Sequence, residues 1–142
     1  MLRTREEEKL TLVGSPSVSL RLFETLVGTA STGLGELTGT GAGTLYGFLR
    51  AGNRIVRLDK KTGSILETYR PDVEIGSGWA FAHWGGDFWL FTAPRNARTT
   101  VSRYSPATNT TTVMIEDTGM LIVGAGSSTC APSAPPARSL PA

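Results

Sequence analysis

The sequence has few of the residues from which covalent or metal-binding sites are built. It contains one cysteine, Cys130, and one histidine, His83. A single cysteine excludes a disulfide within the chain, and the two residues together are too few soft ligands for a structural zinc site. The acidic residues lack the spacing of a calcium-binding loop. We therefore predict no metal and no cofactor, and we expect Cys130 to be a small, partly buried apolar side chain.

An excess of one charge is also missing. The 14 basic and 12 acidic side chains give a net charge of +2 and are scattered along the chain, so we predict no nucleic-acid partner. There is no run of about 18 apolar residues, and we predict no membrane span. The first 30 residues lack the basic start, apolar core and cleavage site of a secretory signal. As given, the chain indicates a cytoplasmic location, whereas a fragment of a longer exported protein would be extracytoplasmic.

What the sequence does have is the composition of an all-β domain. Charged residues make up 18% of the 142 residues, and 17 residues are glycine, which favours strands and turns over long charged helices. The clearest stretch is 78–116, where turn residues separate four β-rich runs. These runs are Trp79–His83, Phe88–Thr92, Thr99–Tyr104 and Thr110–Ile115. Four short strands in a meander of about 40 residues form the unit from which β-propellers are built.

The pattern repeats along the chain. Thr44–Phe48 resembles Asp87–Phe91 at an offset of 43 residues, and Arg57–Gly63 resembles Arg103–Asn109 at an offset of 46. A third, partial copy begins at Met120. These offsets lie in the range of roughly 40 to 50 residues that is expected for propeller blades. We predict an N-terminal lead with one or two strands (1–34), a first blade (35–70), a second blade (78–117), a partial third blade with strands (119–130) and a disordered proline-rich tail (131–142).

Within the lead, the alternation of Val18, Leu20 and Leu22 with polar residues favours a strand. A helix capped by Ser15 with Pro16 in its first turn is the alternative.

Two segments carry a resemblance to known proteins. The hairpin Leu58-Asp59-x-x-Thr62-Gly63 and the following Ile65-Leu66 resemble the repeated element of quinoprotein-like and YVTN-like β-propellers. Trp79–Thr92 and Val123–Pro132 resemble segments of uncharacterised secreted or lipoprotein-type propeller proteins of myxobacteria. The resemblance implies an incomplete β-propeller, since closed propellers use about four to eight blades and this chain shows about two.

An incomplete propeller leaves apolar sheet faces open. Patches beyond several hundred Å² are rare on monomers, so we expect self-association or a partner that supplies the missing blades. The favoured function is a non-enzymatic interaction or ligand-binding module for a protein or carbohydrate ligand. One alternative is an enzyme or cofactor-binding fragment of a quinoprotein-like propeller, which requires ionisable side chains that converge at one end of the blades. The other is a truncated gene product without a function of its own.

Three residues are candidates for ligand binding: Trp79, His83 and Trp84. The tryptophans could form part of an aromatic platform for a sugar or a cation, and packing between blades is the competing use for them. His83 lies near Asp87, but a hydrogen-bonded structural histidine at a strand end is favoured over a catalytic base. No catalytic residue is predicted. The glycine-rich run 39–43 is interpreted as a turn before a strand, because a phosphate-binding loop needs a different spacing and a following helix.

Overall fold

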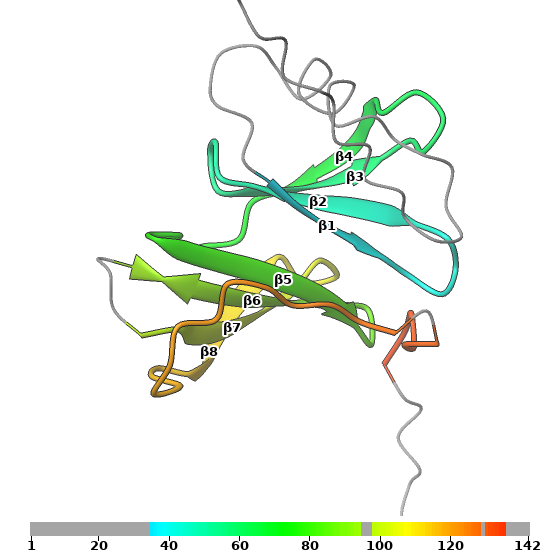
Figure 1. Cartoon of the computed structure of the whole chain (residues 1–142). Helices are drawn as coiled ribbons and strands as arrows, with labels where there is room; N and C mark the ends of the chain where they lie inside the picture. Colours follow the sequence, from blue (N-terminus) through cyan, green and yellow to red (C-terminus); the bar gives the residue numbers. More distant parts are fainter. Residues whose placement is uncertain (1–34, 95–97, 129, 136–142) are drawn as a thin grey trace, which may run out of the picture.

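The computed structural model describes residues 35–94, 98–128 and 130–135, and this part of the chain is all-β, with no α-helix. It forms two four-stranded antiparallel sheets, each a simple meander (Figure 1). The first, sheet A, consists of β1 (Gly35–Gly39), β2 (Leu45–Leu49), β3 (Arg54–Leu58) and β4 (Ile65–Tyr69). The second, sheet B, consists of β5 (Gly78–Trp84), β6 (Asp87–Ala93), β7 (Thr100–Ser105) and β8 (Thr110–Ile115). The all-β prediction and the four strands predicted within 78–116 are confirmed, whereas the strand expected over Val18–Leu22 lies outside the described residues.

Turn chemistry fixes the hairpins where the sequence predicted them. The Asp59 carboxylate accepts the backbone N–H groups of Thr62 and Lys61, each at 2.8 Å, and these bonds hold the pKa of Asp59 below its usual value. Gly63 follows in the left-handed region at φ +72°, as the end of such a turn requires. Asn109 closes the β7–β8 hairpin at φ +52°. Local residue choice therefore sets the strand register.

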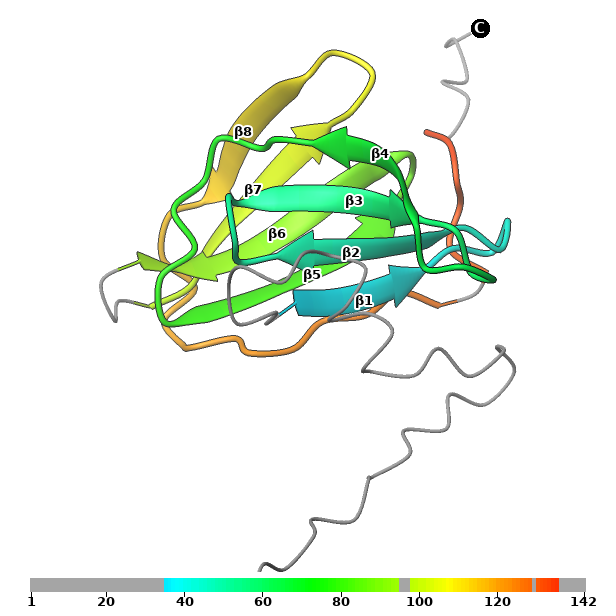
Figure 2. The ribbon, with the colours of Figure 1, turned by 90° about the horizontal axis from the view of Figure 1, so that it is seen from above.

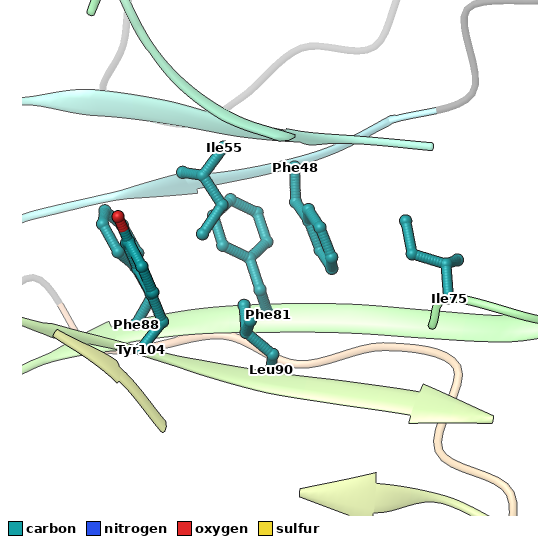
Figure 3. Packing of buried hydrophobic residues seen from close by; sticks show 7 residues of the cluster. All are labelled: Phe48, Ile55, Ile75, Phe81, Phe88, Leu90 and Tyr104. Atoms are coloured by element: carbon teal, nitrogen blue, oxygen red, sulfur yellow. The ribbon is translucent and has the colours of Figure 1, made fainter. Parts of the chain in front are cut away.

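The two sheets pack on each other through an aromatic core (Figure 3). Phe48 and Ile55 project from sheet A, and Phe81, Phe88, Leu90 and Tyr104 project from sheet B, with Ile75 of the connecting segment beside them. Each of these residues is at most 3% exposed. The centroids of the Phe48 and Phe81 rings are 5.6 Å apart, and those of Tyr46 and Phe88 are 4.8 Å apart in an edge-on arrangement, the geometry that aromatic quadrupoles favour.

The sheets are stacked in the same orientation. Figure 2 shows β1 on the side of β5 and β4 on the side of β8, so the strand order runs the same way in both sheets. We call the faces that meet the inner faces and the opposite ones the outer faces. The outer face of sheet A holds a separate buried cluster of Leu49, Val56 and Leu58, with exposures of 2%, 0% and 4%.

Repeat-related positions point the same way along this stack. The repeat offset of 43 residues relates Tyr46 and Phe48 to Trp89 and Phe91. Tyr46 and Phe48 lie on the inner face of sheet A, against sheet B. Trp89 and Phe91 lie on the outer face of sheet B, because they alternate with the inward-facing Phe88 and Leu90. Related residues therefore do not face each other, and the packing is head to tail.

After β8 the chain returns along sheet B as a strap, by which we mean the described residues from Thr118 to Pro135 (Figure 1). At one end Thr99 accepts from Thr118 N and donates its own N–H to the Met120 carbonyl, and its Oγ1 accepts from Ile122 N at 2.7 Å. At the other end the Pro132 carbonyl accepts from Gly85 N at 2.8 Å.

Two predictions fall on the strap. The structure assigns no strand to residues 119–128, so the expectation of strands in this stretch was wrong. The sequence predicts a disordered tail over 131–142. In the structure Ala131 is 6% exposed, and the segment 131–135 lies against the β5–β6 turn. Residues 136–142 lie outside the described part.

Because both sheets share one core, damage to sheet A should destabilise sheet B. We predict that Phe48→Ala lowers the free energy of unfolding by about 3–5 kcal/mol. All three tryptophans lie in sheet B, so tryptophan fluorescence during urea unfolding reports mainly on that sheet, while far-UV circular dichroism follows both. The two transitions should shift together to lower urea. A shift in the dichroism with an unchanged fluorescence midpoint would show that the sheets unfold independently.

Candidate functional site

A shallow, open groove lies on the outer face of sheet B. Its floor and walls are Ala82 and Trp84 of β5, Trp89 and Phe91 of β6, and residues 126–128 of the strap. Its volume is about 330 Å³, its lining is mostly apolar, and it opens to solvent. The Trp84 side chain is 52% exposed, which is unusual for a large aromatic residue in a folded chain.

The strand pairing explains why a groove forms there. Ala82 pairs with Trp89 and Ala80 with Phe91, so each large aromatic side chain of β6 has a small neighbour on β5. The short side chains leave space between the aromatic rings and the strap. The groove is therefore a direct result of strand register together with the path of the C-terminal strap.

A single ion pair lies beside the groove. Arg103 pairs with Trp89 across the β6–β7 ladder, and Asp87 pairs with Trp84 across the β5–β6 ladder. The Arg103 Nε atom is 3.7 Å from Asp87 Oδ2. Both groups are partly exposed, so this pair adds little stability, but it places two polar groups next to the aromatic side chains.

The structure separates the three predicted ligand-binding residues. Trp84 lies in the groove, whereas Trp79 and His83 lie on the inner face. Trp79 packs against the core, and the Arg50 guanidinium lies over its ring at 5.3 Å from the centroid. Trp79 thus packs between the sheets, as the competing interpretation expected. The exposed Trp84 side chain can contact another molecule.

His83 is held by aromatic rings. It is 5% exposed, stacks on Tyr46 with ring centroids 5.7 Å apart, and meets Phe88 edge-on at 5.3 Å. Its Nδ1 atom has no hydrogen-bond partner within the described part of the chain, so aromatic packing is the contact that the structure shows for this ring. Burial lowers the pKa of His83, and the nearby Asp87 opposes this effect in part. The lowered pKa keeps the imidazole neutral at pH 7. The ring lies on the inner face, away from the groove.

The remaining aromatic side chains divide between the two faces. Phe81, Phe88 and Tyr104 pack between the sheets. Phe91 joins Trp84 and Trp89 in the groove. Sequence reasoning missed Ala82 and the strap residues 126–128. Their only signal in the sequence is a run of small residues, which does not reveal which surface they will cover.

The structure also decides the predictions for the run 39–43 and for Cys130. The run 39–43 is a turn between β1 and β2, in which Gly43 N donates to the Thr40 carbonyl at 2.9 Å, and a strand follows it. The turn interpretation is confirmed. Cys130 is exposed, so the expectation of a partly buried side chain was wrong.

Three searches bear on the site as a whole. Among the described residues, no cluster of three or more histidine, cysteine or acidic side chains could hold a metal ion. No helix in the described segments has the length and hydropathy to cross a membrane. No protein family, curated protein or solved structure matches the chain. The function of the chain is therefore inferred from its own geometry.

The buried His83 predicts a pH dependence of stability. Its pKa is lower in the folded than in the unfolded chain, so the unfolded chain binds the proton first as the pH falls. Stability should therefore decrease below the unfolded pKa of about 6.5, with a limiting slope of about 1.4 kcal/mol per pH unit. The measurement is urea unfolding of the wild type and of His83→Phe at a series of pH values, from neutral pH to below about 6.5. The wild type should lose stability in this window and the variant should lose less, whereas identical slopes would contradict the assignment.

Proposed function

We propose that the two sheets are blades of an incomplete β-propeller and that the chain is a non-enzymatic interaction module, with the outer face of sheet B as its binding surface. The observation that carries the proposal is the head-to-tail packing. A β-propeller stacks each blade on the next in the same orientation, and Trp89 and Phe91 take the positions on sheet B that Tyr46 and Phe48 take on sheet A. On sheet A, the side chains of Tyr46 and Phe48 are covered by sheet B.

The strap supports the same interpretation. It follows β5 from Gly78 to the β5–β6 turn, in the direction of β5 (Figure 1). A Cβ atom on Gly78 would lie 2.8 Å from Leu121 Cδ1, so the strap packs closely on the start of this strand. The strap therefore packs on β5 in the way that β5 packs on β1. This is the place that the first strand of a third blade would take, and only the part of the face over β6 to β8 stays open.

The partner that fits this open surface is a sheet face of another polypeptide. In the filled interface, Tyr46 and Phe48 receive Phe88 and Phe81 of sheet B, and the groove offers the equivalent aromatic positions to a partner. Exposed apolar side chains that lie together on a monomer usually mark such contacts. A second copy cannot supply this face through the outer side of sheet A, because Leu49, Val56 and Leu58 are already buried within the chain.

The alternative functions make different demands on the groove. An enzyme would need converging ionisable groups, but Asp87 and Arg103 are engaged with each other and His83 faces the opposite side of the sheet. A carbohydrate ligand would use the same aromatic rings through stacking, so experiment must separate it from a polypeptide partner. A truncated product without function would bind neither.

The test places a photo-crosslinking benzoylphenylalanine at position 84 of the full chain in its native cells, with position 66 on β4 as the control. Leu66 is 49% exposed, close to the exposure of Trp84. We expect one reproducible crosslinked protein from position 84 only, and at least an about tenfold loss of this product when Phe91→Glu is added, because a buried charge opposes apolar docking.

The carbohydrate alternative is tested on the same protein by titration of tryptophan fluorescence with cellopentaose, maltopentaose and chitotriose. Saturable binding that Trp84→Ala abolishes, without a protein crosslink, would replace the polypeptide partner by a sugar. Absence of both signals would contradict the interaction-module proposal.

A further inference from the structure

The free edges of the two sheets are not protected equally. An exposed edge strand presents unpaired backbone N–H and C=O groups, and folded proteins usually protect it with a charge, a proline, an irregularity or a covering segment. β1 carries Glu36 on its inner face, and β4 carries Glu67, which pairs with Arg57 at 2.6 Å. β5 lies beside β1 and the strap. These three edges therefore each have one of the known protections.

The edge of β8 differs from the other three. Its sequence, Thr-Thr-Thr-Val-Met-Ile, contains no charge and no proline, and it pairs with β7 alone among the described strands. Val113, Met114 and Ile115 are 54%, 46% and 49% exposed. A register shift between Val101 and Ser102 leaves Met114 without a partner residue on β7, so the regular part of the β8 edge is Thr110–Val113. An uncharged and partly apolar strand with a free edge favours the addition of another strand.

We propose that β8 is a self-association edge, at which the β8 strands of two copies of this chain pair antiparallel and join their B sheets into one continuous sheet. A two-fold axis brings the same strand from both copies together, as closed dimers require. The pairing satisfies free backbone groups along the regular part of β8, Thr110–Val113, in both copies. It leaves the groove on the outer face of sheet B accessible, so it is independent of the proposed function.

The charges around β8 select the antiparallel arrangement. Glu116 and Asp117 follow the strand directly, and the turn that precedes it, 106–109, has no charge. In an antiparallel pair the acidic end of one copy lies beside the uncharged turn of the other. A parallel pair would place Glu116 and Asp117 of one chain beside the same two residues of the second chain. Like charges that face each other across strands are destabilising. The second copy is therefore a matching occupant for this edge.

Two matched variants test the proposal in sedimentation equilibrium of the full chain over a concentration series. Thr112→Lys places a charge on the β8 edge, and Thr68→Lys places the same charge on the β4 edge, where the side chain is also exposed. Because a two-fold interface contains each substitution twice, Thr112→Lys should raise the dimer dissociation constant by at least about tenfold. Thr68→Lys should leave it within about twofold.

Amide hydrogen exchange gives a second measurement that does not depend on a variant. The amides of Thr110–Ile115 should exchange more slowly as the protein concentration rises, while those of Ile65–Tyr69 should not change. A monomer at every concentration would overturn the proposal. A dimer that responds to Trp84→Ala or to Thr68→Lys, but not to Thr112→Lys, would overturn it as well, because the contact would then lie on a sheet face or on β4.

Discussion

The structure depends on the packing of one aromatic face on another. Tyr46 and Phe48 of sheet A meet Phe88 and Phe81 of sheet B. An isolated four-stranded sheet has one face to bury and no second layer to bury it against. Each sheet therefore stabilises the other, and removal of large aromatic side chains from such a site costs several kcal/mol. His83, Tyr69 and Tyr104 extend the same aromatic cluster toward the edge of the sheets.

The orientation of this packing determines what remains open. If repeat-related faces met each other, the stack would be complete with two sheets, as in a symmetric sandwich. Here the packing is head to tail, so each layer buries one face and presents the equivalent of its neighbour's inner face on the other side. Trp89 and Phe91 consequently lie on an outer surface that is only partly covered by the strap. The groove is the part of this outer face, between the aromatic rings and the strap, that no other described segment covers.

The sequence was sufficient for the local structure but not for the arrangement of the layers. Turn residues such as Asp59, Gly63 and Asn109 act through their own backbone conformation, so the hairpins and strand limits could be predicted closely. Alternation shows that the aromatic residues of β5 and β6 occupy two faces, but it does not show which face meets sheet A. For that reason Trp79, His83 and Trp84 were grouped as candidates although only Trp84 lies in the groove. Met120–Gly124 has high β-propensity, yet a strand also needs a ladder partner, and the structure gives this segment a different role.

The head-to-tail packing of the sheets is the central claim, and aromatic nuclear Overhauser effects measured on the full chain test it most directly. The head-to-tail stack predicts contacts from the Tyr46 ring to Phe88 and His83, contacts from Phe48 to Phe81, and none from the side chains of Trp89 or Phe91 to sheet A. Contacts between Trp89 or Phe91 and the rings of Tyr46 or Phe48 would mean that repeat-related faces pack on each other. That result would contradict the head-to-tail stack and, with it, the proposed binding surface.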